Sequence, residues 1–169
     1  IKMNIEIKTE TSLDADDEVY NFSKKLIDIL HKYNITDDII IQSFDTRALK
    51  YVKEIDPSIT TSYLIEDKLP NIDSLINTSK QLGVKIISPD YNLIDKQIVK
   101  KLQENGFDVL PWTINDLNTF KKNIDYGVDG HDRFGFYAAA ALFRANCMSD
   151  YGSNRRACKS VTGPMPAPT

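Results

Sequence analysis

The chain has 169 residues and a formal net charge of −3, with 41% hydrophobic and 27% charged residues, a composition typical of one globular domain. This charge excludes a protein-wide positive field of the kind that attracts nucleic acid or anionic lipid. No apolar run approaches the roughly 20 residues of a membrane helix, and no signal-peptide pattern opens the chain. Two cysteines, Cys147 and Cys158, define neither a disulfide framework nor a zinc site.

Short runs rich in Ile and Val alternate with amphipathic stretches through the first 130 residues. The predicted strands are Met3–Thr9, Asp38–Phe44, Ile59–Ile65, Val84–Pro89 and Asp108–Ile114. The predicted helices are Asp14–Tyr33, Thr46–Ile55, Ile72–Leu82, Ile94–Glu104 and Asp116–Ile124, followed by stop residues Asn34, Gly83, Gly106 and Gly127. Such alternation predicts a parallel sheet with helical crossovers. Five units and a sixth strand beginning at Val128 favour most of a (β/α)8 TIM-type barrel over a doubly wound open sheet, although periodicity does not separate the two.

The composition changes sharply near Gly130. Residues 1–130 contain 20 Ile and two Ala, whereas residues 131–169 contain no Ile and seven Ala. We therefore predict one domain over 1–130, followed by an unrelated Ala/Arg-rich tail over 131–169. Because the chain begins within a strand-like pattern and without Met, we also expect a segment upstream of Ile1.

The first strand, MNIEIKTE, carries charged residues at alternate positions. In a barrel strand, alternate side chains point to the helix layer and to the interior. Met3, Ile5 and Ile7 would pack under helices, which leaves Asn4, Glu6, Lys8 and Glu10 pointing inward. Interior charges are costly unless they are paired or bind a metal or ligand, and the strand ends of such barrels carry the active sites. The alternative is an edge strand with a solvent-facing Glu–Lys ladder.

Polar and aromatic residues also gather where later strands end. The second strand ends in Gln42, Ser43, Phe44 and Asp45, and the third brings Tyr63 near its end. The only Trp, Trp112, follows the fifth strand and precedes Asn115, so that its indole could line a pocket. The alternatives are that Asp45 is a helix N-cap, that Trp112 fills the core, and that Asn115 or Asp116 caps the next helix.

These stretches together resemble the glycerophosphodiester phosphodiesterase family. MNIEIK is similar to the family's NIEIK strand, IIIQSFD to its SF(D/N) strand end, FDVLPWTIN to its WTVN segment, and YGVDG to its GVDG segment. The resemblance runs through residues 3–130 in family order. It implies a (β/α)8 barrel, here incomplete and lacking its first strands.

The resemblance implies hydrolysis of glycerophosphodiesters to an alcohol and glycerol 3-phosphate with a divalent cation, Ca²⁺ or Mg²⁺. The resemblance also implies roles for three residues. Glu6 would be a carboxylate that binds the metal, Lys8 would place a positive charge beside the phosphate, and Trp112 would form an aromatic wall beside the glycerol group. Ser43, Phe44, Tyr63 and Asn115 match strand-end positions around the pocket. We expect a small-molecule substrate, no nucleic-acid partner and no membrane span.

The family's catalytic histidines and two further metal carboxylates lie in segments that precede the NIEIK strand. Neither His31, within the first predicted helix, nor His131, just after GVDG, matches them. The chain alone is therefore expected to be inactive. Two alternatives stay open: a non-catalytic barrel fragment or fusion module with a vestigial pocket, and a related barrel such as a phosphatidylinositol-specific phospholipase or a spider-type sphingomyelinase. A barrel without its first strands also has open sheet edges, which favour self-association.

Overall fold

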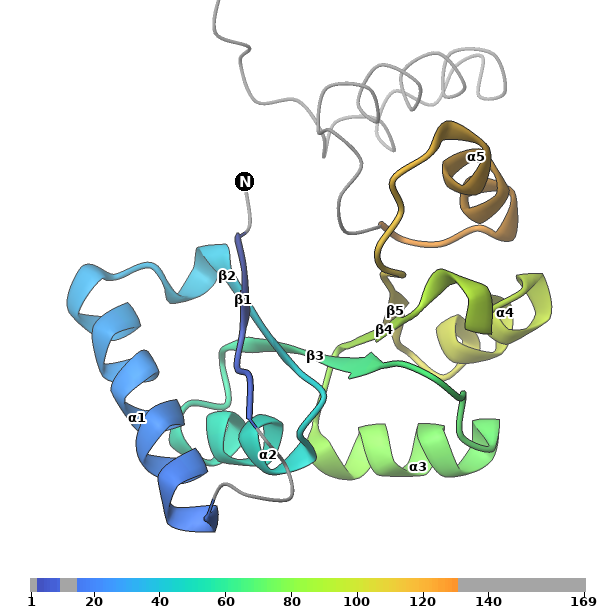
Figure 1. Ribbon diagram of the computed structural model, residues 1–169. Coiled ribbons are helices and arrows are strands. Elements are labelled where there is room, and N and C mark those ends of the chain that lie inside the picture. Colours follow the sequence, from blue (N-terminus) through green and yellow to red (C-terminus); the bar gives the residue numbers. More distant parts are fainter. Residues whose placement is uncertain (1–2, 10–14, 131–169) are drawn as a thin grey trace, which may run out of the picture.

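The computed structural model describes residues 3–9 and 15–130 of the chain. In this part, five parallel strands form one sheet, and their spatial order is their order in the chain. The strands are β1 (Met3–Glu6), β2 (Ile39–Ser43), β3 (Thr60–Ile65), β4 (Ile86–Pro89) and β5 (Asp108–Val109). Figure 1 shows the strands as the inner layer of a curved molecule.

Five α-helices connect the strands and follow one another around the outer side of the curved sheet (Figure 1). They are α1 (Asp16–Tyr33), α2 (Thr46–Ile55), α3 (Ile72–Leu82), α4 (Lys96–Glu104) and α5 (Leu117–Tyr126), with short 3₁₀ turns at Thr36–Asp38 and Tyr91–Leu93. A doubly wound sheet has helices on both faces and a reversal of strand order. Neither occurs in the described part, so the open-sheet alternative is wrong and the fold is part of a TIM-type barrel.

Local chemistry sets the helix boundaries. The side chains of Asp45, Asn71, Asp95 and Asp116 each accept hydrogen bonds from backbone N–H groups of the first helical turn. Asn34, Gly83 and Gly127 adopt the left-handed conformation at the ends of α1, α3 and α5. The predicted bounds of α2 and α3 are confirmed, because cap residues fix both ends of each segment. Helix α4 begins two residues later than predicted, because Asp95 caps it.

The core lies between the sheet and its helices. Strand residues of alternate parity, such as Ile41, Ile87 and Val109, are fully buried there against helix residues such as Leu49 and Leu102. This alternation identifies the faces of each strand, because successive side chains point to opposite sides. The prediction that Ile5 and Ile7 pack under helices is confirmed, whereas Met3 remains 51% exposed.

All five predicted strands are shorter in the structure, the first and the fifth most of all, and the predicted sixth strand is absent from the described part. Strand β1 ends at Glu6, and β5 contains two residues. Residues 128–130 are not a strand, although the Asp129 N–H donates to the Val109 carbonyl at 3.0 Å and its carboxylate accepts from the Val109 N–H at 2.8 Å. The predicted tail, with His131, Cys147 and Cys158, lies outside the described residues, as does Glu10. No helix in the described part is both long and apolar enough to cross a bilayer.

Candidate active site

A row of polar side chains crosses the face of the sheet that is turned away from the helices. Glu6 of β1 is in register with Gln42 of β2, and Gln42 is in register with Ser62 of β3. Their chain neighbours Ile41 and Thr61 point to the opposite face of the sheet, where Ile41 packs in the core against the helices. Gln42 and Ser62 are buried, with exposed fractions of 8% and 1%. We call Glu6, Gln42 and Ser62 the inner polar row.

A serine pair extends this row to β4. The hydroxyl oxygens of Ser62 and Ser88 lie 2.7 Å apart, so one hydroxyl donates to the other. The indole Nε1–H of Trp112 donates to the carbonyl oxygen of Ser88 at 2.8 Å. Trp112 also pairs with Asp90 in an isolated parallel bridge. The segment after β5 is therefore fixed against the end of β4, and the indole N–H is already bonded.

Two aromatic rings lie beyond the inner polar row, toward the carboxyl ends of the strands. Phe44 follows Gln42 by two positions and so has the same parity. Its ring meets the ring of Trp112 edge to face, with centroids 5.5 Å apart and planes at 82°. Both side chains are half-buried. Phe44, just after β2, and Trp112, after β5, thus form an apolar wall on the inner side of the sheet.

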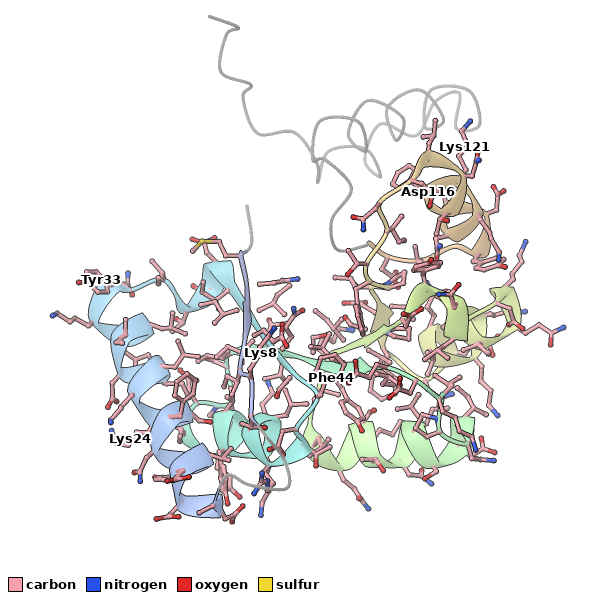
Figure 2. All side chains as sticks on the ribbon, viewed as in Figure 1. Lys8, Lys24, Tyr33, Phe44, Asp116 and Lys121 are labelled. Atoms are coloured by element: carbon pink, nitrogen blue, oxygen red, sulfur yellow. The ribbon has the colours of Figure 1, made fainter. Side chains whose placement is uncertain are left out.

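Lys8 and Glu6 carry the charges of this region. Lys8 Nζ lies 3.9 Å from Glu6 Oε2, and their side chains are 81% and 27% exposed. An exposed pair at this distance contributes little to stability. Figure 2 shows the labelled Lys8 and Phe44 on the inner side of the ribbon, between the α1 side and the α5 side of the molecule. Lys8 is therefore free to reach an anion at the carboxyl end of β1.

Three other predicted site residues lie elsewhere. Ser43 is buried on the helix side of β2, where its hydroxyl donates to the Ile7 carbonyl at 2.7 Å and accepts from the Asp45 N–H at 3.1 Å. Tyr63 packs against the helix-side core, and burial raises the pKa of its phenol. Asn115 is exposed after Trp112. The structure thus brings Glu6, Lys8, Phe44 and Trp112 to the inner side, but not Ser43 or Tyr63.

Asp45 combines a capping role with a buried ion pair at the rim. Its carboxylate accepts from the Arg47 N–H at 2.9 Å and from Thr9 Oγ1 at 2.8 Å, and it lies 2.8 Å from Arg47 Nη2. Burial raises the pKa of Asp45, but the hydrogen bonds from Arg47 and Thr9 outweigh it and hold the pKa below its usual value. The capping alternative for Asp45 is confirmed, and the same side chain fixes the backbone just after Lys8.

His31 lies away from the inner polar row. Its Nε2 is 2.6 Å from Asp56 Oδ2, near the end of α1 and just after α2. These segments lead into the amino ends of β2 and β3, whereas Lys8 and Phe44 lie at the carboxyl ends. Hydrogen bonds from Ser58 and His31 lower the pKa of Asp56 to about 2. The described histidine is thus hydrogen-bonded to an aspartate at the other end of the sheet.

Comparison with known proteins identifies the family. The model of the glycerophosphoryl diester phosphodiesterase family matches residues 1–131. The chain belongs to this family. It is 27% identical over 128 residues to the glycerophosphodiester phosphodiesterase of Bacillus subtilis (strain 168), covering 75% of this chain and 43% of that protein. It is 28% identical over 128 residues to the same enzyme of Caldanaerobacter subterraneus, covering 76% and 49%. The chain therefore spans about half the length of these glycerophosphodiester phosphodiesterases.

The fold agrees with solved structures of the family. An Oleispira antarctica phosphodiesterase, solved in complex with the product sn-glycerol-3-phosphate, superposes with a TM-score of 0.68 at 22% identity. The match covers 78% of this chain and 51% of that one. At this identity the likeness shows the fold, which is the partial barrel described above.

Glycerophosphodiester phosphodiesterases in general depend on a divalent metal. A hard cation such as Ca²⁺ takes six to eight oxygen ligands. Among residues 3–9 and 15–130, no group of three or more His, Cys, Asp or Glu side chains is arranged to hold a metal. Glu6 is a single carboxylate beside the amide of Gln42. The described residues alone therefore do not fit such a cation, and no step through a metal is derived from them.

The sequence pattern alone assigns no role to Gln42, Ser62 or Ser88. Each stands at an inward-facing position of its strand, in IIIQSF, TTSYLI and IISP. A polar residue on the interior side of a barrel strand is the signal that could have indicated them.

Proposed function

We propose that this chain forms the substrate-binding side of a glycerophosphodiester phosphodiesterase, which hydrolyses its substrate to an alcohol and glycerol 3-phosphate. The membership of the family supports the reaction. One observation supports the site: the rings of Phe44 and Trp112, from separate strand ends, meet edge to face. Lys8 extends from the end of β1 on the same side of the ribbon as Phe44.

In this proposal each residue acts on a different part of the substrate. The Lys8 ammonium attracts the phosphodiester anion as a point charge. The rings of Phe44 and Trp112 cover the carbon–hydrogen surface of the glycerol group and exclude water from it. Glu6 supplies one carboxylate toward a divalent cation, for which we propose Ca²⁺ or Mg²⁺. Ser43, Tyr63 and Asn115 are proposed to act at the periphery, Ser43 by fixing the backbone of β1 and of the segment before α2.

We also propose that the 169 residues alone do not catalyse the reaction. General acid–base catalysis needs a positioned proton donor and acceptor, and the histidine of the described part, His31, is bonded to Asp56 away from Lys8. The second candidate function, a non-catalytic barrel module, rests on this same placement. The two candidates differ in whether residues encoded upstream of Ile1 supply the missing groups.

The test compares the 169-residue chain with a version that carries the residues encoded upstream. Each is incubated with sn-glycero-3-phosphocholine and Ca²⁺, Mg²⁺ or Mn²⁺, and released glycerol 3-phosphate is measured. We expect turnover in the longer version only, loss of turnover with chelator, and a raised KM in Lys8→Ala. The control Lys24→Ala changes an exposed lysine of α1 that pairs with Asp28 at 2.6 Å. A longer version inert with all three cations would favour the non-catalytic module.

A further inference from the structure

Lys8 lies beyond the last backbone pairing of its strand, so its place depends on other contacts. Strand β1 ends at Glu6, and the last backbone bond to β2 runs from the Ile7 N–H to the Gln42 carbonyl at 2.9 Å. The Lys8 side chain is 81% exposed, and its ion pair with Glu6 spans 3.9 Å. Such a contact is too weak to hold a long side chain in one place. The position of the Lys8 ammonium is therefore set by how the backbone around it is held.

The segment between β2 and α2 holds that backbone on both sides of Lys8. Before Lys8, the Ser43 hydroxyl donates to the Ile7 carbonyl at 2.7 Å. After Lys8, the Thr9 hydroxyl donates to the Asp45 carboxylate at 2.8 Å. The Asp45 N–H donates in turn to the Ser43 hydroxyl at 3.1 Å, which joins the two contacts. Both bonds start from buried side chains, since Ser43 and Asp45 are 1% and 4% exposed.

Arg47 supports the Asp45 carboxylate and extends the contact to the next helix. Its Nη2 lies 2.8 Å from Asp45 Oδ2, and its Nη1 lies 3.7 Å from Oδ1 of Asp16, the first residue of α1. The Tyr51 hydroxyl donates to the other oxygen of the Asp16 carboxylate. The residue that follows Lys8 and the residue that begins α1 are thus both bound to side chains of α2 and its cap.

Burial separates Asp45 from the other side-chain caps of the described helices. Those caps belong to exposed residues, Asn71, Asp95 and Asp116. A cap needs only a side-chain oxygen near the N–H groups of the first turn, whereas a buried carboxylate must be compensated by charged and hydrogen-bonding partners. Asp45 has such partners in Arg47 and Thr9. Capping alone does not require this arrangement, which points to a second role at the end of β1.

We propose that Thr9, Asp45 and Arg47 are positioning residues that set the place of Lys8 for the phosphodiester anion. The inference rests on the proposed function and deepens it. Arg47 holds the Asp45 carboxylate, Asp45 holds the Thr9 hydroxyl, and Thr9 fixes the backbone that follows Lys8. All three act through Lys8. Without them its ammonium samples more positions, and binding of the anion loses more conformational entropy.

The test measures steady-state kinetics of the version that carries the residues encoded upstream of Ile1, with sn-glycero-3-phosphocholine as substrate. Thr9→Val retains the shape of the side chain and removes its hydroxyl. We expect it to raise KM about fivefold, the order of one hydrogen bond, and to leave kcat unchanged. Thr9→Ser, which retains a hydroxyl, should keep the original KM. Thr78→Val, at an equally half-buried threonine of the outer helix α3, should change neither constant.

A double variant separates positioning from a merely structural role. If Thr9 acts through Lys8, Thr9→Val does not raise KM further in a Lys8→Ala background, whereas independent effects would add. Equal effects of Thr9→Val with and without Lys8 would overturn the proposal, as would an unchanged KM in a folded Thr9→Val. Ser43→Ala removes the bond to Ile7 on the other side of Lys8 and gives the same comparison if Thr9→Val does not fold.

Failure of the proposed function gives a different result. A longer version that releases no glycerol 3-phosphate, or a Lys8→Ala variant with an unchanged KM, would overturn the proposed function and this inference with it. Turnover that depends on Lys8 but not on Thr9 would overturn the positioning role alone.

Discussion

The indole N–H of Trp112 donates to the carbonyl oxygen of Ser88 at 2.8 Å, which fixes the segment after β5 against the end of β4. Trp112→Phe removes this bond and retains a ring that can face Phe44. We expect it to lower the free energy of unfolding by about 1 kcal/mol. Because Trp112 is the only Trp and its removal abolishes the Trp fluorescence signal, urea denaturation is followed by far-UV circular dichroism.

Phe44→Leu is the matched variant, since it retains the hydrogen bond of Trp112 and removes the ring contact. An unchanged denaturation midpoint in Trp112→Phe would contradict the role of the bond.

Asp45 and Asp116 are both helix N-caps, but only Asp45 is buried and paired with Arg47. Asp116→Ala should cost about 1 kcal/mol, the usual loss for a cap. Asp45→Ala should cost about 2–3 kcal/mol, because it also removes the hydrogen bonds that the carboxylate accepts from the side chains of Arg47 and Thr9. Denaturant midpoints of the two variants, measured side by side, test this. Equal losses would show that the contacts with Arg47 and Thr9 add nothing to capping.

The hydrogen bonds that Asp56 accepts from Ser58 and His31 predict how stability changes in acid. An aspartate whose pKa is lower in the folded than in the unfolded state contributes stability above its unfolded pKa. That contribution is lost as the pH falls from the unfolded value, about 3.9, to the folded pKa of about 2. We expect the free energy of unfolding to fall more steeply between pH 4 and pH 2 in the unchanged chain than in Asp56→Asn. Parallel curves would contradict the assignment.

The free side of β1 predicts self-association of the isolated chain. In the described sheet β1 pairs only with β2, and exposed apolar residues continue along α1 at Phe22, Ile29 and Tyr33. Unpaired strand edges and apolar stripes both favour association. We expect sedimentation velocity to show a concentration-dependent oligomer, reduced in Phe22→Lys/Ile29→Glu. Lys25→Glu, an exposed charge change on α1, should leave the oligomer unchanged; a single monomer peak at all concentrations would contradict the prediction.

Most of the fold could be predicted from the sequence because its signals are local. The cap at Asp45 and the stop at Gly83 fix helix ends within one turn of chain. Strand lengths are less predictable, since a strand extends only as far as its neighbour pairs with it. The last backbone bond from this segment to β2 is the Ile7 N–H to the Gln42 carbonyl, and Lys8 and Thr9 lie beyond it although their alternation continues.

The site was harder to predict, because its chemistry depends on which face each side chain takes. Ser43 and Phe44 are adjacent in a polar strand end, yet Ser43 bonds the backbone on the helix side and Phe44 meets Trp112 on the inner side. The sequence favours both as pocket residues, and only the register separates them. Gln42 lies between Ile41 and Ser43, and only the register shows that it stands beside Glu6 of the neighbouring strand.

The sequential order of the strands has a consequence for synthesis. Each strand pairs with the strand that precedes it in the chain. As the chain leaves the ribosome, every new strand can therefore pair with a strand that has already been synthesised. Each pairing therefore needs only the next β–α unit and not a strand from the far end of the described chain. Because the strands pair in chain order, a nascent chain that stops after any β–α unit has a last strand that is paired on one side only.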